Sequence, residues 1–339
     1  MRIYTLLLAA MTALPLAGPP AIAQTVDFKG KQIKLLIGFG PGAGYDQYGR
    51  IVAAHIGKHL PGNPTLVPQN MPAAGSIQAA NRIYVQAPKD GTEWGIIARD
   101  AILTPLTKPG EGALFDATKF SWLGSPDSET NVCIANASSG VKTAKDLFDK
   151  QLVVGSTGIG TGTYIYPIVL NGMIHTKFKV IDGYPASSDV FLAMERHEVE
   201  GICESYSSVI RKNAQAIKDG TIVILFWAGH PLPELKDIPH VASLVTKPED
   251  KQLLDFMYAG QIYARPFVAP PGLPPAVYKV LKDGFAETLK DPAFLADADK
   301  QKLEIKPVSA DETLDAVKKA YATPKPLIDR MAGFLKTGG

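Results

Sequence analysis

The sequence predicts an α/β protein built as two lobes with a ligand cleft between them. Short apolar runs, glycine-rich turns and helical stripes alternate along the chain, an order typical of a parallel α/β sheet. The pattern restarts near residue 132 with no flexible linker before it. A chain of 339 residues also exceeds what one hydrophobic core usually supports, so two units are expected.

The first unit opens with an apolar run at residues 33–37, broken only by Lys34, which predicts a strand covered on both faces. After a glycine turn, apolar residues recur at helical spacing until Pro61-Gly62 stops the pattern. The helical stripe consists of Tyr48, Ile51, Val52, Ile56 and Leu60. The other elements expected here are strands at 65–67 and 94–98, a turn at 70–76 and a helix at 77–84.

The second unit is expected to hold helices between strands at 132–135, 152–154, 178–181, 199–203 and 222–226. Near the C-terminus, Pro275 stands at a permitted first helical position, and Ser309 and Glu312 form a capping box. We expect these last helices to return to the first unit, by analogy with two-domain binding proteins that cross their hinge repeatedly. Lobe I is then residues 24–125 plus 257–339, and lobe II is residues 126–256.

The first 23 residues predict a secretory signal peptide. Arg2 gives a positive start, residues 3–16 form an uncharged apolar core, and Ala21-Ile22-Ala23 is a small-x-small cleavage site. The apolar core is shorter than the ~20 residues of a membrane span. We therefore expect export to the periplasm with cleavage after Ala23, and a mature chain without a membrane span.

Charge and cysteine content limit the partners and cofactors. The formal net charge is +2, and the leader holds one cation and no acid, so the mature chain is left with +1. This near-neutral balance gives no argument for nucleic acid or a membrane surface as partner. Cys133 and Cys203 form either a bridge between neighbouring strands or two buried free thiols, and their spacing fits no zinc site.

The loop Gly38-Phe-Gly-Pro-Gly42-Ala-Gly44-Tyr-Asp46 stands between a predicted strand and a predicted helix. Its glycines let the backbone approach a ligand and present N–H groups at a helix start, which suits a carboxylate or phosphate. A dinucleotide fingerprint also fits these glycines, but it needs an acid about 20 residues on, and residues 65–70 offer none. In the plain structural alternative, Asp46 only caps the helix.

The loop from Gly155 to Tyr164 repeats this placement in the second unit. It adds four hydroxyls, those of Ser156, Thr157, Thr161 and Thr163, and glycines such as Gly160 that allow close approach to a ligand. Two such loops facing across a cleft would hold an anion by neutral donors. The alternative is a flexible surface turn.

Other candidates are weaker. Arg99-Asp100 ends a predicted strand where open sheets bind ligands, so Arg99 either meets a carboxylate or pairs with Asp100 at the surface. His55 and His59 lie four apart on one helix without a third metal ligand. A secreted α/β hydrolase is the competing function, and it would require a base within hydrogen-bond reach of Ser156, since no G-x-S-x-G motif occurs. A module for sugars or phosphate esters is a third possibility.

Five motifs in order resemble the solute receptors of tripartite tricarboxylate transporters, the Bug-type periplasmic binding proteins. They follow the predicted leader and span nearly all of the mature chain. The motifs are Pro41-Gly-Ala-Gly-Tyr-Asp46, Asn70-Met-Pro-Ala-Ala-Gly-Ser76, Ala87-Pro-Lys-Asp-Gly91, Ser156-Thr-Gly-Ile-Gly-Thr161 and Gly183-Tyr-Pro-Ala-Ser187.

The resemblance implies a two-lobed type II periplasmic-binding-protein fold and a monomeric, non-enzymatic receptor without a cofactor. It implies capture of a small di-, tri- or aromatic carboxylate and delivery to integral membrane subunits of a transporter. Backbone N–H groups and hydroxyls of both lobes would hold the ligand. The residues indicated are Gly42, Ala43, Gly44, Tyr45, Asp46, Ala74, Gly75, Ser76, Ser156, Thr157, Gly160, Thr161, Thr163, Tyr164 and Tyr184, with Arg99 added from its position.

The chain departs from the family pattern at aromatic positions. Tyr45 stands where Thr or Ser is frequent, Tyr164 stands where histidine is common, and the second turn has Gly75-Ser76. Together with Tyr184 these tyrosines predict a more aromatic pocket. An aromatic or longer carboxylate is therefore as reasonable a ligand as a tricarboxylate.

Overall fold

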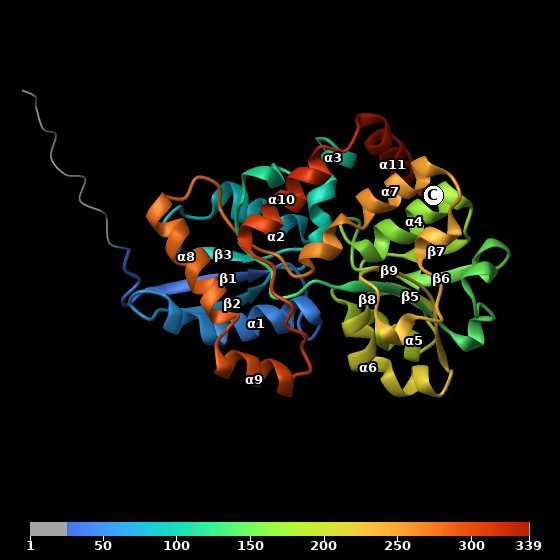
Figure 1. The fold of residues 1–339 in the computed structure, drawn as a ribbon, viewed down its shortest axis with the longest axis horizontal. Helices are drawn as coiled ribbons and strands as arrows, with labels where there is room; N and C mark the ends of the chain where they lie inside the picture. Colours follow the sequence, from blue (N-terminus) through green and yellow to red (C-terminus); the bar gives the residue numbers. More distant parts are fainter. Residues whose placement is uncertain (1–25, 111, 339) are drawn as a thin grey trace, which may run out of the picture.

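A computed structural model describes residues 26–110 and 112–338. The predicted signal peptide lies outside the described residues. The chain forms two five-stranded sheets, each with helices on its faces, and the two resulting lobes lie side by side (Figure 1). The predicted two-lobed α/β fold is thus confirmed.

The first sheet has the strand order β2-β1-β3-β10-β4. Strand β1 is parallel to β2 and β3, whereas β10 is antiparallel to both of its neighbours. The strands are β1 (Gln32–Ile37), β2 (Thr65–Asn70), β3 (Glu93–Ile96), β4 (Ser121–Gly124) and β10 (Phe267–Ala269). The helices of this part are α1 (Gly44–Ile56), α2 (Ile77–Asn81), α3 (Thr104–Thr107), α8 (Pro275–Thr288), α9 (Pro292–Lys300) and α10 (Ala310–Tyr321).

The second sheet has the order β7-β6-β8-β5-β9. Strand β6 is parallel to β7 and β8, and β5 is antiparallel to β8 and β9. The strands are β5 (Thr130–Asn136), β6 (Leu152–Gly155), β7 (Phe178–Ile181), β8 (Gly201–Ser205) and β9 (Ile222–Gly229). The helices are α4 (Gly162–Ile174), α5 (Ser187–Glu195), α6 (Tyr206–Lys218), α7 (Pro248–Met257) and α11 (Lys325–Thr337).

The expectation of purely parallel sheets is wrong, because each sheet is mixed. A parallel neighbour requires a crossover helix, whereas β5 enters the second sheet directly from β4 and runs antiparallel to β8. In the same way β10 re-enters the first sheet from the second lobe and pairs antiparallel between β3 and β4. Hydrophobicity along a strand reports burial and carries no information on direction.

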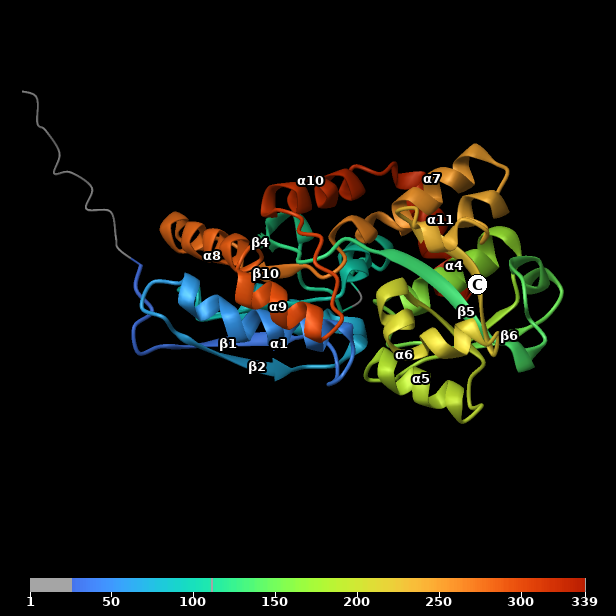
Figure 2. The same ribbon diagram turned by 60° about the horizontal axis from the view of Figure 1, so that its bottom comes forward.

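The chain crosses between the lobes more than once, as Figure 2 shows for the segment leading into β5. Val308 exchanges two backbone hydrogen bonds with Ser125 beside this segment. Helices α8 and α10 pack against β4, and α9 packs against α1. Helix α11 packs against α4 and α7 of the second lobe, with the Phe334 ring seated over Gly172, and also against α3 of the first lobe. The C-terminal helices α8, α9 and α10 therefore return to the first lobe and α11 bridges the two lobes, and the lobe boundaries stay a prediction.

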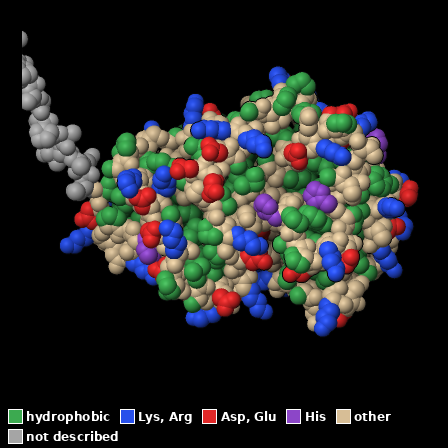
Figure 3. Space-filling model, viewed as in Figure 1, with side chains coloured by type: hydrophobic (Ala, Val, Ile, Leu, Met, Phe, Trp, Pro, Cys, Tyr) green, Lys and Arg blue, Asp and Glu red, His purple; other side chains and the backbone are tan. Residues whose placement is uncertain are grey.

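Local signals in the sequence explain many of the element ends. Pro275 is the first residue of α8, and Ser309 and Glu312 form the expected capping box of α10. Basic and acidic side chains are interspersed over the face in Figure 3, in keeping with the small net charge. Within the described ranges, no helix combines the length and apolarity that crossing a bilayer requires.

Candidate functional site

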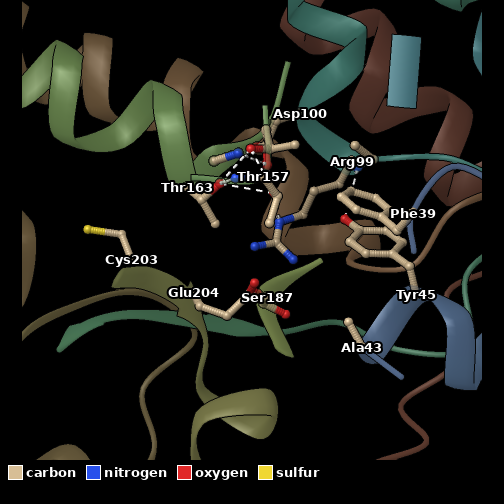
Figure 4. A pocket seen from close by; sticks show the side chains of 13 residues that line it. Phe39, Ala43, Tyr45, Arg99, Asp100, Thr157, Thr163, Ser187, Cys203 and Glu204 are labelled. Carbon is tan, nitrogen blue, oxygen red and sulfur yellow. Dashed lines mark hydrogen bonds and ion pairs between the residues drawn. The ribbon is translucent and has the colours of Figure 1, made fainter. Parts of the chain in front are cut away.

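A small buried cavity lies between the two lobes, at the carboxyl ends of strands of both sheets (Figure 4). Its volume of about 20 Å³ is enough for roughly one water molecule. Open α/β sheets bind ligands at this edge. The lining residues are Phe39, Ala43, Tyr45, Ala98, Arg99 and Asp100 of the first lobe, and Thr157, Thr161, Gly162, Thr163, Ser187, Cys203 and Glu204 of the second.

Six of the sequence-predicted residues line this cavity: Ala43, Tyr45, Arg99, Thr157, Thr161 and Thr163. The Tyr45 ring stacks on Phe39 with centroids 4.2 Å apart, and its hydroxyl accepts a hydrogen bond from the backbone N–H of Arg99 at 3.1 Å. Burial raises the pKa of Tyr45, against the lowering effect of two nearby arginines. Tyr45 is therefore a neutral aromatic wall with a fixed orientation.

Asp46 is buried but does not line the cavity. Its carboxylate accepts hydrogen bonds from the backbone N–H of Gly42 at 2.9 Å and from the side chains of Arg50 and Asn70. Burial opposes its ionisation, but these hydrogen bonds outweigh that effect and hold its pKa below the usual value. Asp46 thus fixes the first glycine loop from behind, and Gly42 and Gly44 shape that loop without lining the cavity.

The second turn of the first lobe also lies outside the cavity lining. Ala74, Gly75 and Ser76 all adopt positive φ, at 46°, 61° and 76°. The Ser76 hydroxyl is fully buried and accepts a hydrogen bond from the backbone N–H of Ala98 at 3.0 Å. A Cβ on Gly75 would lie 2.7 Å from the backbone nitrogen of Gly160, so this turn touches the loop of the opposite lobe.

The hydroxyl loop of the second lobe is an ordered cluster. The hydroxyl oxygens of Thr161 and Thr163 are 2.6 Å apart, and Thr163 also accepts a hydrogen bond from the backbone N–H of Thr157. All three threonines line the cavity. Tyr164 and Tyr184 are half-buried outside the lining, so the aromatic wall consists of Phe39 and Tyr45.

Ser156 is turned away from the cavity. Its hydroxyl donates to Asp182 at 2.9 Å and accepts from the backbone N–H of Gly158 at 3.1 Å. This contact is the one that a hydrolase would need at Ser156. However, Ser156 is fully buried outside the cavity lining and no histidine lines the cavity, so the geometry is that of a loop-fixing hydrogen bond.

Three helices begin at this cavity. In none of them does the side chain of the N-cap residue form a capping hydrogen bond with the first turn. Helix α1 begins beside Ala43, α4 begins at Gly162, and α5 begins at Ser187. The first turn of a helix leaves its N–H groups without intrahelical partners and carries a partial positive charge. The arrangement therefore concentrates donors and positive potential on one small space.

One of these helix ends already holds a carboxylate from the other lobe. Asp100 accepts from the backbone N–H of Gly162 at 3.0 Å and from the hydroxyl of Tyr166 at 2.8 Å. Burial raises the pKa of Asp100, and the charge of Arg99 acts against that rise. Together with a hydrogen bond from Gly40 N–H to the Pro185 carbonyl, this contact joins the lobes directly.

Arg99 also belongs to a buried ionic cluster whose other members, Glu129 and Arg265, the sequence did not indicate. Glu129 pairs with Arg99 at 3.2 Å and with Arg265 at 2.9 Å, and all three are nearly inaccessible to solvent. Burial raises the pKa of Glu129, but the charges of Arg265 and Arg99 outweigh it and the net shift is downward. The Arg265 guanidinium also lies over the Tyr45 ring, 4.6 Å from its centroid. Arg99 is therefore a fixed, internally paired cation and not a surface partner of Asp100 alone.

Cys133 and Cys203 face each other on the antiparallel strands β5 and β8 and are joined by a disulfide. Of the two alternatives, the structure shows the bridge. Cys203 lines the cavity, so the bridge fixes the strand that carries the neighbouring Glu204. Within the described ranges, no group of three or more histidine, cysteine and acidic side chains is placed to hold a metal ion.

Sequence reasoning missed Phe39, Ser187, Glu204, Glu129 and Arg265 as parts of the site or its support. Phe39 and Ser187 stand inside motifs that were singled out, so the signal was present. Glu204 ends a predicted strand, which is the position used to select Arg99. Glu129 and Arg265 carry no local signal, because only the chain crossings bring them together.

The fold is the two-lobed fold of the periplasmic binding proteins, with a cavity between the lobes. No protein-family model matches the chain. A curated relative, the UPF0065 protein in the gbd 5′ region of Cupriavidus necator, is 25% identical over 303 residues, covering 84% of this chain and 83% of the relative.

Solved structures agree over nearly the whole fold. The periplasmic binding protein BugD is 18% identical with a TM-score of 0.66, covering 91% of this chain and 97% of its own. MatC of Rhodopseudomonas palustris with bound malate is 15% identical with a TM-score of 0.67, covering 88% and 98%. An R. palustris protein with adipate is 16% identical with a TM-score of 0.67, covering 91% and 99%. These comparisons confirm the predicted fold, and the neighbours include the Bug-type receptors that the sequence resembles.

Proposed function

We propose that this chain is a periplasmic solute-binding receptor that captures a small carboxylate and delivers it to the membrane subunits of a tripartite tricarboxylate-type transporter. The observation that carries the proposal is the convergence of the starts of α1, α4 and α5 on one interlobe cavity that Arg99 also lines. Helix N-termini are natural anion sites, and the start of α4 already accepts the Asp100 carboxylate while the starts of α1 and α5 have no capping side chain. Neutral hydroxyls of the second lobe add further donors.

The comparisons support the solute class. MatC is described with bound malate and the R. palustris protein with adipate, and both are small dicarboxylates. We propose that this chain binds a ligand of this chemistry, functions without a cofactor and has no catalytic step.

The size of the cavity indicates how binding works. About 20 Å³ is too small for a dicarboxylate, and the turn at residues 74–76 of the first lobe touches the glycine loop of the second lobe across the cleft. The solute must therefore enter a more open form, and it stabilises closure only by its differential affinity for the two forms. The Asp100 contact with α4 is one interaction that opening must break.

The expected location follows from the proposal and the leader. A receptor of this class works in the periplasm, and cleavage after Ala23 would release it as a soluble monomer. N-terminal sequencing of the protein secreted to the periplasm tests this, and a mature chain that still begins at Met1 would contradict it.

The decisive experiment is a thermal-shift screen with mono-, di-, tri- and aromatic carboxylates, followed by calorimetry. A ligand at 100 times its dissociation constant should add roughly 2.7 kcal/mol of stability. Thr161→Ala and Thr163→Ala should weaken binding by roughly 3- to 100-fold, since each removes one hydrogen bond to a charged acceptor. Thr221→Ala, at an exposed position outside the cavity lining, is the matched control. No stabilisation by any carboxylate, or wild-type affinity in both cavity variants, would overturn the proposal.

A further inference from the structure

A second and larger cavity lies at the junction of the two lobes. Its volume of about 790 Å³ falls in the range of small-molecule pockets, roughly 300–1,000 Å³. Its walls come from the end of β9, helix α7, the short helix Ala259–Tyr263, and parts of α10 and α11. Figures 1 and 2 both show α7, α10 and α11 along one side of the molecule, over the junction of the lobes. No residue lines both this cavity and the interlobe cavity.

Two walls of the larger cavity are segments in which the chain crosses between the lobes. The helix Ala259–Tyr263 follows α7 of the second lobe and leads into β10 of the first sheet. Residues 322–324 join α10, which packs against β4, to α11, which packs against α4 and α7. The lining residues from these crossings are Ala259, Gln261, Ile262, Ala322, Thr323 and Pro324. A molecule in this cavity would therefore contact the segments that adjust when the lobes separate.

The lining of the larger cavity is mostly apolar, and its formal charges balance. Leu254 and Phe256 are buried side chains of its wall, and Ile262 adds an apolar side chain that is 42% exposed. Lys319 carries the one formal positive charge among the lining residues, and Asp255 carries the one formal negative charge. An uncharged, mostly apolar molecule suits such a lining, because burial of apolar surface supplies the driving force.

His240 adds a polar group to this lining without adding a charge. Its Nδ1 accepts a hydrogen bond from the backbone N–H of Ala242 at 3.2 Å. Burial lowers the pKa of His240, although the charge of Asp255 acts against that effect. The neutral ring then carries its proton on Nε2, which makes that nitrogen a hydrogen-bond donor.

Two further polar atoms of lining residues are buried without a hydrogen-bond partner in the described part of the chain. They are the hydroxyl of Tyr258 and Oε1 of Gln261, whose residues are 8% and 2% exposed. Buried polar atoms are rarely left unpaired. Both atoms are covered by neighbouring groups, so a ligand would pair with them once the lining adjusts around it.

We propose that this cavity is a second ligand site, which takes a small uncharged molecule that is mostly apolar and carries a hydrogen-bonding group. The proposal goes beyond the receptor function and does not depend on it, since the two cavities share no lining residue. The apolar part of the ligand would cover Ile262, and its polar group would pair with Gln261 or Tyr258.

A chain of hydrogen bonds links this site to the contact between the lobes. Nε2 of Gln261 donates to the Tyr166 hydroxyl at 2.9 Å, and that hydroxyl donates to Asp100 at 2.8 Å. Asp100 of the first lobe also accepts from the backbone N–H of Gly162, at the start of α4, at 3.0 Å. The Tyr258 ring lies 4.2 Å from the Tyr166 ring between centroids. Occupancy of the second site is therefore coupled to lobe closure, and such coupling acts in both directions.

The test is a fluorescence titration with N-phenyl-1-naphthylamine, an uncharged aromatic amine whose emission rises in apolar surroundings. The wild type should bind it at one saturable site. Ile262→Asp should weaken binding roughly 5-fold or more, because it removes apolar surface and adds an unbalanced charge. Leu295→Asp is the matched control, since Leu295 is 41% exposed on α9 and outside the cavity lining, and it should bind as the wild type does.

The preference for an uncharged ligand and the coupling need separate measurements. The anionic analogue 8-anilinonaphthalene-1-sulfonate should bind more weakly than the amine. Asp100→Asn weakens the contact between the lobes and so lowers the population of the closed form, which should weaken binding of the amine roughly 3-fold or more. Asp299→Asn, at an exposed position on α9, is the control for this variant.

Absence of saturable binding in the wild type, wild-type affinity in Ile262→Asp, or tighter binding of the sulfonate than of the amine would overturn the second site. Wild-type affinity in Asp100→Asn would overturn its coupling to the lobe contact. Thermal unfolding without the probe checks that each variant folds, and Ala322→Asp, at the exposed second crossing, replaces Ile262→Asp if that variant does not. The receptor function is tested with carboxylates instead, so the two proposals fail separately.

Discussion

The contact between the turn at residues 74–76 and the glycine loop of the second lobe makes lobe closure sensitive to a single methyl group. Gly75 of the first lobe has a φ of +61°, and a Cβ there would lie 2.7 Å from the backbone nitrogen of Gly160 and 2.9 Å from its Cα. Ordinary van der Waals contact begins at 3.4 Å, so Gly75→Ala leaves a shortfall of about 0.7 Å. Both opposing atoms are backbone, which cannot rotate aside.

The cost can be assigned to the closed form alone. Overpacking a close contact costs about 1–3 kcal/mol, and the contact is lost when the lobes separate. Because the solute binds by stabilising closure, its affinity should fall by roughly 5- to 150-fold. The left-handed backbone strain of alanine, about 1–2 kcal/mol, is present in both forms and lowers stability without changing affinity.

Gly140→Ala is the matched control for this prediction. Gly140 has a similar φ of +82°, but a Cβ there meets nothing within 4 Å. Both variants should unfold at lower temperature than the wild type, and only Gly75→Ala should lose affinity in calorimetry with a carboxylate identified by the screen. Small-angle scattering should show less ligand-induced compaction for Gly75→Ala. Equal affinities for the two variants would refute the assignment of this contact to closure.

Three further predictions concern stability. Glu129→Gln leaves two buried guanidinium groups without their shared carboxylate, so urea unfolding should show that the free energy of unfolding falls by about 3–5 kcal/mol. The exposed control Glu198→Gln should change this free energy by less than about 0.5 kcal/mol. Similar small effects in both variants would contradict the role of the cluster. The Cys133–Cys203 bridge joins residues 70 apart in the sequence, so its reduction should lower the free energy of unfolding by about 4 kcal/mol. A melting temperature that does not change when reductant is added would argue against a stabilising bridge. The pKa of Asp46 is lowered in the folded state, so the stabilisation by its carboxylate is present above a pH of about 4 and is lost as the pH falls through the lowered folded-state pKa. The difference in free energy of unfolding between the wild type and Asp46→Asn should therefore shrink on acidification. A difference that does not change with pH would show that hydrogen bonds to the ionised carboxylate are not the source of this stabilisation.

The sequence by itself determined the elements that depend on local patterns. The apolar run of β1, the proline start of α8 and the capping box of α10 all lie where the sequence predicts them. Two glycine loops at strand ends were also enough to locate the interlobe edge, because glycine permits close backbone approach and the carboxyl ends of strands are where such sheets bind ligands.

Only the tertiary structure decided which side chains in those loops face the cavity. Ser156 and Thr161 stand in one motif, yet the first hydroxyl turns to Asp182 while the second faces the cleft. That choice depends on Asp182, which the neighbouring strand β7 brings beside the loop. Local sequence carries no record of this contact.

The charges of the site were decided in the same way. Glu129 and Arg265 are 136 residues apart and form an ion pair because two chain crossings place them side by side between the lobes. Glu204 lies across the cavity from Arg99 because β8 of one sheet ends where β3 of the other ends. Periodicity and capping report interactions within a few residues, whereas the balance of charge in the cleft arises from segments that only the packing of two lobes brings together.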